Sequence, residues 1–378
     1  MPSSPKIIFI LIDWFLPAYK GGGPIQSVGN LVQLYAKDNI QYRIFCGDKD
    51  HDGTAIEVEA YDKWVDFNPH TKVWYATAAT RNIASIKKEV DSIKPDILFV
   101  NGIYSILFNF KPLLFLHVPR TVISVRGMLH PGALSQKSLK KKAYLMLWKL
   151  LGFHKENIYH ASTEEEKTFI LNAMGKQSHV MIAPNFPKQI PFQPCITKQV
   201  GILNLVSIAL VSPMKNHLEV LKALVSLKEN IWYHIYGPIK DAAYWETCKS
   251  IIASMPVNIQ VIYHGDVNPL RIQEALATGE VFILPSKSEN FGHAIYEALT
   301  AGKPIITSTT TPWNNLQQHK AGINVDMALS PQKLGEAIST FAAMDPINFS
   351  EWNKGAAAFA EHSINLNAIE KAYDQLFL

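Results

Sequence analysis

Two glutamates in the second half of the chain are the residues best suited to chemistry. Glu289 and Glu297 have seven residues between them and follow an apolar run that ends at Leu284. A helix that starts near Gly292 would point free backbone N–H groups toward an anion. A carboxylate has about four acceptor sites and can receive hydrogen bonds from two vicinal hydroxyls of a sugar. The spacing therefore predicts a site for an anion joined to a sugar. The simpler alternative is that Glu289 only caps the helix and Glu297 is exposed.

One lysine can supply positive charge to the same site. Lys215 lies in the segment Ser212-Pro213-Met214-Lys215-Asn216, which follows the first apolar run of the second half. An ammonium group there would neutralise a departing phosphate; the alternative is a solvated lysine at a helix start. Glycine turns at Gly237 and just before Asp266 end two further apolar runs. Each is a candidate ligand loop or an ordinary turn.

Two loops of the first half are candidates for contact with a phosphate or an acceptor. Gly21, Gly22 and Gly23 follow the first apolar run and expose backbone N–H groups, although they do not form the Gly-x-Gly-x-x-Gly fingerprint of dinucleotide sites. Arg126 and His130 follow a later apolar run. A flexible turn and an ordinary loop histidine are the alternatives. No His, Cys and carboxylate cluster has metal-ligand spacing, so no metal is expected.

Together these motifs resemble a known family. Glu289 and Glu297 with Phe291-Gly292 between them, followed by Gly302-x-Pro304, resemble the EX7E motif of retaining nucleotide-sugar glycosyltransferases of family GT4, which have the GT-B fold. The other family motifs occur in the expected order along nearly the whole chain: the glycine-rich loop, Pro184-Asn185, the Ser-Pro-x-Lys-Asn segment and Tyr236-Gly237-Pro238.

The resemblance implies a role for each matched residue. Glu297 would bind the donor ribose, Glu289 would hold the donor sugar near its anomeric carbon, and Lys215 would contact the diphosphate. Further donor contacts would come from two places: backbone N–H groups around Asn290, Phe291 and Gly292, and the loops that contain Gly237 and Asp266. GT-B enzymes typically need no metal, and the nucleotide-diphosphate sugar is a substrate, so no cofactor is expected.

The chain departs from the family pattern at two positions. Leu210 stands where the family usually places an arginine on the diphosphate, and Arg126, Arg271 or another basic group would have to replace it. Many relatives have a histidine near the place of Arg126, and here His130 lies four residues later. Arg126 and His130 are therefore expected to line the acceptor side.

Apolar runs that alternate with segments of helical period must position these residues. The alternation is typical of βαβ units on a parallel sheet, and a proline-rich stretch, Pro184 to Pro194, interrupts it near the midpoint. We expect an α/β protein of the GT-B type, with two tandem Rossmann-like, doubly wound domains that face a cleft. The acceptor-binding domain would cover residues 1–188 and the donor-binding domain 189–359. A C-terminal helix over about 360–378 would pack back on the first domain.

Composition and charge narrow the function classes. The 378 residues are 48% hydrophobic and 18% charged, which excludes a disordered or coiled-coil protein. Residues 1–199 hold 24 basic and 16 acidic residues, a net charge of +8, whereas residues 200–378 hold 12 and 16, a net charge of −4. The basic half predicts an anionic partner.

Cys46, Cys195 and Cys248 form no Cys-x-x-Cys pair, which fits a reducing cytoplasm. The first apolar run, Ile7–Ile12, is too short for a signal peptide or a membrane span.

A lysine-rich segment in the basic half suggests contact with a membrane. At about 100° per residue, Gln136–Leu151 places Leu139, Ala143, Met146 and Leu150 on one stripe of a helix. Lys137, Lys140, Lys141, Tyr144 and Trp148 fall on roughly the opposite face. Lysines interleaved with Tyr and Trp suit the inner face of an anionic membrane, and a core helix with a solvated lysine face is the alternative. Motifs for nucleic-acid binding are missing.

The combined prediction is a retaining, metal-independent hexosyltransferase of GT4 type. It would move a sugar from a nucleotide-diphosphate sugar to a glycan hydroxyl, on a lipid-linked acceptor, in the biosynthesis of cell-surface polysaccharide. The alternatives are a catalytically inactive subunit that binds nucleotide sugar or membrane, and another GT-B enzyme such as a sugar-nucleotide epimerase.

Overall fold

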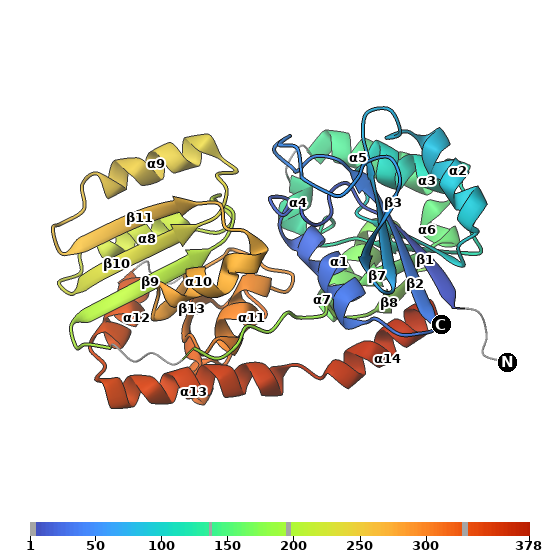
Figure 1. Ribbon diagram of the computed structural model, residues 1–378. Coiled ribbons are helices and arrows are strands. Elements are labelled where there is room, and N and C mark those ends of the chain that lie inside the picture. The colour runs from blue at the N-terminus through green and yellow to red at the C-terminus, as the bar shows by residue number, and fades with distance from the viewer. Residues whose placement is uncertain (1–4, 136–137, 194–197, 327–331) are drawn as a thin grey trace. The chain divides into compact units, whose positions relative to one another are not determined.

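The chain forms two α/β units (Figure 1). The computed structural model describes residues 5–135, 138–193, 198–326 and 332–378. The first unit consists of Met1–Phe186 together with Leu366–Leu378, and the second consists of Pro187–Asn365.

The first unit is built on an eight-stranded sheet with the order β3-β4-β2-β1-β5-β6-β7-β8. Its strands are β1 (Lys6–Leu11), β2 (Ile40–Gly47), β3 (Trp64–Asn68), β4 (Thr71–Ala76), β5 (Ile97–Asn101), β6 (Arg120–Ser124), β7 (Ile158–Ala161) and β8 (His179–Ile182). Every pairing is parallel except β3 with β4. The hairpin β3–β4 and the short strand β7 do not follow from the apolar runs, because Asp66 and His160 interrupt them with polar side chains.

Helices cover the first sheet, and the last helix of the chain is among them. They are α1 (Gly23–Leu34), α2 (Ile83–Ile93), a π-helical turn (Ile106–Phe110), α3 (Lys111–Phe115), α4 (Pro131–Ser135), α5 (Ser138–Leu150), α6 (Phe153–Glu156), α7 (Glu164–Met174) and α14 (Leu366–Phe377). The helix expected over about 360–378 begins at Leu366. Its Tyr373 ring lies 5.6 Å from the ring of Tyr35 and 5.1 Å from that of Phe186, and Lys37 Nζ lies 2.7 Å from Asp374 Oδ1. These contacts make α14 part of the first unit.

The second unit is built on a six-stranded, all-parallel sheet with the order β11-β10-β9-β12-β13-β14. Its strands are β9 (Ile202–Ile208), β10 (Asn230–Tyr236), β11 (Ile259–Gly265), β12 (Val281–Leu284), β13 (Ile305–Ser308) and β14 (Gly322–Val325). Its helices are α8 (His217–Leu224), α9 (Ala242–Ile252), a 3-10 turn (Pro269–Arg271), α10 (Ile272–Ala277), α11 (His293–Thr300), a second 3-10 turn (Gln317–His319), α12 (Gln332–Ala342) and α13 (Pro346–Ser363). The central strand β12 is a continuous apolar run, as expected for a strand that is buried on both faces. Two α/β units, whose sheets are parallel apart from the β3–β4 pairing, confirm the predicted fold class.

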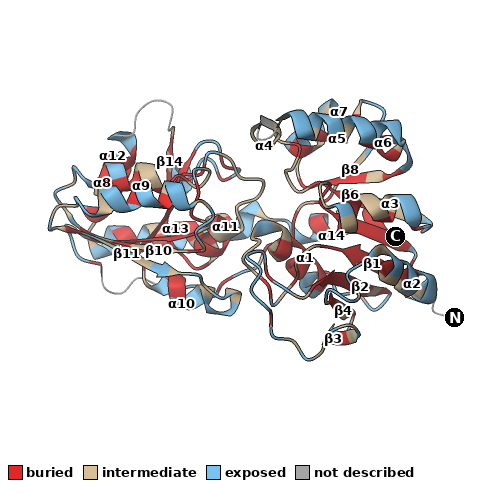
Figure 2. Cartoon of the chain, turned by 90° about the horizontal axis from the view of Figure 1, so that it is seen from above, coloured by how far each residue is buried: buried red, intermediate tan, exposed pale blue. Residues whose placement is uncertain are grey.

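The structure corrects the predicted faces of α5. Trp148, expected on the membrane-facing side, is fully buried, and its Nε1 donates a hydrogen bond of 2.7 Å to the Tyr159 hydroxyl. Tyr144 packs between Phe110 and Trp148, with ring centroids 5.7 Å from each. Leu139 and its stripe are exposed instead, and Figure 2 shows much of α5 in the colour of exposed residues. Aromatic side chains bury more apolar surface than leucine, and the unit provides a partner for the indole N–H, so burial selects this face. Lys137 lies outside the described residues.

The orientation of α5 leads to a stability prediction. Trp148→Ala should lower the free energy of unfolding by about 3–5 kcal/mol, because it empties a filled core site. Leu150→Ala on the same helix should change it by less than about 0.5 kcal/mol, because that side chain is 82% exposed. Urea denaturation followed by circular dichroism measures both values. Equal losses in the two variants would show that the described orientation is wrong.

Candidate functional site

The predicted donor residues of the second unit all follow neighbouring strands at one edge of the sheet. Lys215 comes after β9, Gly237 directly after β10, Asp266 directly after β11 and Glu289 after β12. These four strands are adjacent in the order β11-β10-β9-β12. Because the strands are parallel, their carboxyl ends meet at the same edge, which is where ligands bind in open α/β sheets.

An ion pair joins two of these loops. Lys215 Nζ lies 2.5 Å from Glu289 Oε1, and the two side chains are only 21% and 10% exposed. Ser286 Oγ donates a second hydrogen bond to the same carboxylate oxygen, at 2.7 Å. A backbone bond from the Lys287 N–H to the Met214 carbonyl, 2.9 Å long, ties the loops together. The ammonium and the carboxylate are therefore held in place at the carboxyl ends of β9 and β12.

His217, which the sequence reasoning missed, lies beside this pair. It opens α8, is buried, and has a pKa lowered to about 4 by burial and by the charge of Lys215. The imidazole is therefore neutral near pH 7. Of these two side chains, only Lys215 brings positive charge to the site.

The loop before α11 is held rigidly around Gly292. Gly292 has φ 78°, in the left-handed region that favours glycine, and an added Cβ would lie 3.2 Å from Trp313 Nε1. The indole N–H of Trp313 donates a 2.6 Å hydrogen bond to the Phe291 carbonyl. The first backbone N–H groups of a helix have no partner within the helix. The structure thus places Asn290, Phe291 and Gly292 at a helix start that can receive negative charge.

Glu297 lies in the second turn of α11 and is buried. Burial raises the pKa of its carboxyl to about 7, and the positive charge of Lys188 opposes part of that rise. A carboxyl poised at this pKa changes charge in the neutral range. The simpler alternative, that Glu297 is merely exposed, is therefore wrong.

Hydroxyl side chains at the end of β13 support the Glu289 loop, and the sequence reasoning missed them. Ser308 Oγ and Thr310 Oγ1 donate hydrogen bonds of 2.5 and 3.0 Å to the Ser286 carbonyl. Thr307 Oγ1 donates a 2.8 Å bond to the Leu284 carbonyl. The run of five hydroxyl residues at 307–311 is the signal that could have identified this support.

The loop at Gly237 is shaped by a close approach of two backbones. An added Cβ on Gly237 would lie 2.0 Å from the Ala209 carbonyl oxygen, so only glycine fits there. The Tyr263 hydroxyl donates a 2.9 Å hydrogen bond to the Gly237 carbonyl. Beside it, the rings of Tyr236 and His264 stack with centroids 4.2 Å apart and an angle of 5° between their planes. Asp266 follows as an exposed side chain.

The structure offers little to replace the missing arginine within the second unit. Leu210 is half-buried and brings no charge. Arg271 is exposed, and its Nη2 lies 2.7 Å from Glu274 Oε2, so its guanidinium pairs locally, with a residue three positions along the chain.

In the first unit, a buried aspartate that the sequence reasoning missed holds the glycine-rich loop. The Asp50 carboxylate accepts hydrogen bonds from the N–H groups of Tyr19, at 2.9 Å, and Lys20, at 3.1 Å. Gly22 caps α1 with φ 75°, and the loop Gly21–Gly23 leads directly into that helix. The structure therefore places these glycines after β1 at a helix start.

Arg126 and His130 differ in the hydrogen-bonding groups that they leave for a ligand. Arg126 has φ 55°, unusual for a residue with a side chain. Its Nε donates to Asn101 Oδ1 at 2.9 Å and its Nη1 to Asn185 Oδ1 at 2.5 Å. Within the described part of the chain, its Nη2 has no hydrogen-bond partner. The His130 Nδ1 accepts a 3.0 Å hydrogen bond from the Gly132 N–H and so serves a local turn.

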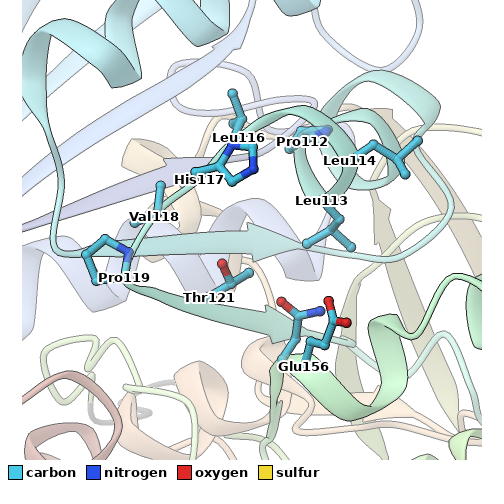
Figure 3. Close-up of a pocket in the computed structure, with 10 residues that line it drawn as sticks. Pro112, Leu113, Leu114, Leu116, His117, Val118, Pro119, Thr121 and Glu156 are labelled. Carbon is cyan, nitrogen blue, oxygen red and sulfur yellow. The ribbon is translucent and has the colours of Figure 1, made fainter.

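A cavity of about 560 Å³ lies elsewhere in the first unit (Figure 3). Leu113, Leu116, Val118 and Glu156 help to line it, and they precede β6 and β7. It therefore lies at the amino ends of these strands, opposite the edge that carries Arg126.

Over the residues that the structure covers, no group of three or more His, Cys, Asp or Glu side chains is placed to hold a metal ion. Likewise, no described helix is long and apolar enough to cross a membrane.

Comparisons with known proteins identify a family for part of the chain. Residues 201–353 match the family model described as "Glycosyl transferases group 1". The second unit is therefore a group 1 glycosyltransferase domain. Sulfoquinovosyl transferase SQD2 from Arabidopsis thaliana is 30% identical over 70 residues, and the match spans 18% of this chain and 13% of that protein.

Solved structures are similar over both units. Sucrose-phosphate synthase from Thermosynechococcus elongatus has a TM-score of 0.73 and 15% identity, covering 99% of this chain and 98% of that chain. HepE from Anabaena, solved with UDP-glucose, has a TM-score of 0.68 and 15% identity, covering 98% of this chain and 99% of that chain. The fold of the chain is GT-B.

The buried carboxyl of Glu297 leads to a pH prediction. Its folded pKa of about 7 lies above the ordinary 4.5, so ionisation costs more in the folded chain than in the unfolded chain. Its contribution to stability should be complete below pH 4.5 and should be lost as the pH rises to about 7, by about 3 kcal/mol. Glu297→Gln should remove this loss. Urea denaturation at pH 5 and pH 8 measures it in both proteins.

Glu361→Gln is the matched control, because Glu361 is exposed on α13. This control should keep the pH dependence of the natural protein. The same pH dependence in Glu297→Gln would contradict the raised pKa.

Proposed function

We propose that the chain is a retaining, metal-independent glycosyltransferase of family GT4 that uses a nucleotide-diphosphate sugar. The observation that carries this proposal is the Lys215–Glu289 pair beside the start of α11, at the carboxyl edge of a group 1 glycosyltransferase domain. The likeness to HepE, solved with UDP-glucose, supports this class of donor.

The proposed roles follow the chemistry of each group. Lys215 and the N–H groups at the start of α11 stabilise the negative charge that develops on the departing diphosphate. Glu289, held by Ser286, accepts hydrogen bonds from hydroxyls of the donor sugar. Glu297, when ionised, accepts both ribose hydroxyls. Gly237 and Asp266 border the nucleotide, and the flat Tyr236–His264 stack gives that edge a surface for a base.

The transfer step conserves the configuration at the anomeric carbon. The acceptor hydroxyl attacks from the face that the diphosphate leaves, so one C–O bond forms as another breaks. The hydroxyl proton passes to a departing phosphate oxygen. No cofactor enters this step, and a fixed ammonium group with a helix end supplies the positive charge that the leaving group needs.

The acceptor belongs to the first unit in this proposal. Gly21 and Gly23 bring backbone N–H groups to the start of α1, whereas the Gly22 N–H donates a 3.0 Å hydrogen bond to the Tyr19 carbonyl. Arg126 offers a guanidinium that the described structure pairs with amides and not with a carboxylate. His130 lies on the same loop. We take the acceptor to be a glycan hydroxyl on a lipid carrier, in the biosynthesis of cell-surface polysaccharide at the cytoplasmic face of the membrane.

Removing either member of the ion pair should abolish transfer. Lys215→Ala and Glu289→Gln should each reduce kcat by about 10²–10³ or more, the loss typical of one missing electrostatic contact to the transition state. Nucleotide release from a panel of nucleotide sugars, with and without a lipid-linked acceptor, measures this. Turnover like that of the natural protein in both variants would overturn the proposal.

A second ion pair provides the matched control. Lys222 Nζ and Glu219 Oε1 lie 2.8 Å apart on α8, near the surface. Lys222→Ala and Glu219→Gln should retain full activity, and circular dichroism should show all four variants folded.

A second candidate function is a catalytically inactive subunit that still binds nucleotide sugar. Leu210 favours it, because a leucine at this position takes the place of one of the cations expected on the diphosphate. Nucleotide binding without release from any donor would support this candidate. A product with an altered sugar ring and no transfer would instead indicate another GT-B enzyme, such as a sugar-nucleotide epimerase.

A further inference from the structure

Helix α5 exposes a row of large apolar side chains. Leu139, Met146 and Leu150 are 82%, 72% and 82% exposed, and Leu147 beside them is 43% exposed. At about 100° per residue they lie within a sector of about 100° on one face of the helix. We call these four side chains the α5 stripe. Scattered exposed leucines are ordinary on a protein surface, but four on one helix face form a patch that needs a partner.

Lysines border the stripe on both sides. Lys140 lies along one edge, and Lys142 and Lys149 lie along the other. All three are exposed. Between Ile97 and Lys155 the sequence has nine lysines and arginines and no aspartate or glutamate. The stripe therefore lies in a strongly basic surrounding.

The inner face of α5 prevents the stripe from turning inward. Trp148 is buried and bonded to Tyr159, and the Tyr144 hydroxyl donates to the Ile103 carbonyl. Lys141 also belongs to this inner side, because its Nζ donates a 2.5 Å hydrogen bond to the Ala133 carbonyl and lies 5.2 Å from the Tyr104 ring centroid. The exposed stripe is thus a fixed feature of the first unit.

We propose that α5 docks flat on an anionic lipid membrane through the α5 stripe. An apolar centre bordered by lysines matches a bilayer surface, in which the stripe enters the acyl boundary while the ammonium groups reach the headgroups. The 13 residues of α5 extend about 20 Å, less than the roughly 30 Å of a bilayer core, so the helix lies in the surface. A second copy of the chain is a poorer occupant, because a symmetric contact would bring the lysines of both copies together.

This inference depends on residues other than those of the proposed transfer reaction. The helix belongs to the connection between β6 and β7, and it follows the loop with Arg126 and His130. Docking would therefore place that loop close to the lipid surface. The sequence had assigned membrane contact to Tyr144 and Trp148, and the opposite face now takes that role.

Vesicle sedimentation tests the docking. The full chain is mixed with vesicles of phosphatidylcholine and phosphatidylglycerol, or of phosphatidylcholine alone. It should sediment with the anionic vesicles and be released by high salt, which screens the lysines. The variant Leu139→Ser/Met146→Ser/Leu150→Ser should bind at least about tenfold more weakly, since it removes most of the buried apolar surface. The variant Lys140→Glu/Lys142→Glu/Lys149→Glu should weaken binding at low salt by a similar factor.

Matched variants control for folding and for general surface effects. Val257 and Ile347 of the second unit are 100% and 79% exposed, so Val257→Ser/Ile347→Ser removes similar apolar surface elsewhere. Lys88→Glu/Lys176→Glu changes charge on other exposed helix and loop positions of the first unit. Both should bind like the natural protein.

Three results would overturn the proposal. The first is the absence of binding to anionic vesicles, and the second is equal binding by the stripe variant and its control. The third is a natural protein that binds no vesicles and is a dimer in sedimentation velocity, while the stripe variant is a monomer; the stripe would then be a contact between copies. Nucleotide release with a soluble acceptor should be unchanged in the stripe variant, so a failed transfer reaction and a failed docking remain distinguishable.

Discussion

The parallel pairing of β12 with β9 is the constraint on which the second unit depends. Phe282 lies opposite Val206 in this pairing, although the two strands are far apart in the chain. The approach is so close that a Cβ on Gly279 would lie 2.5 Å from the Val206 Cγ1. Glu280 fixes the register, because its backbone N–H donates to the Asn204 carbonyl at 2.7 Å while its carboxylate accepts from the Asn204 N–H at 2.8 Å. This pairing brings the loops with Lys215 and Glu289 to the same edge.

Charge at that edge is local and does not follow from the composition of the second half. The region from residue 200 onward is acidic overall, with 12 basic and 16 acidic residues, yet its candidate phosphate site has groups that can bind an anion. These groups are the ammonium of Lys215, which is paired with Glu289, and the start of α11. In the basic first half, by contrast, the positive charge is not confined to one site. It is spread along a surface that includes α5.

Helix α5 shows how far periodicity can lead. The 100° pattern correctly separated two faces, one with Leu139, Met146 and Leu150 and one with Tyr144 and Trp148. It could not tell which face is buried, since both carry apolar groups. The decision came from Phe110, Phe153 and Tyr159, which lie outside α5 and complete an aromatic cluster around the indole.

The sequence alone determined the fold class, and it predicted that Lys215, Gly237 and Glu289 follow apolar runs, because apolar runs, helix starts and glycine turns are local signals. It also indicated the Glu289 and Glu297 spacing and the change to leucine at position 210. Only the tertiary structure showed that Lys215 pairs with Glu289, that Ser286 and Ser308 support the loop, and that Asp50, Asn101 and Asn185 hold the loops of the first unit. These contacts join residues that follow separate strands. Local sequence patterns do not contain the order of the strands in the sheet, so they cannot show which strand ends lie next to each other.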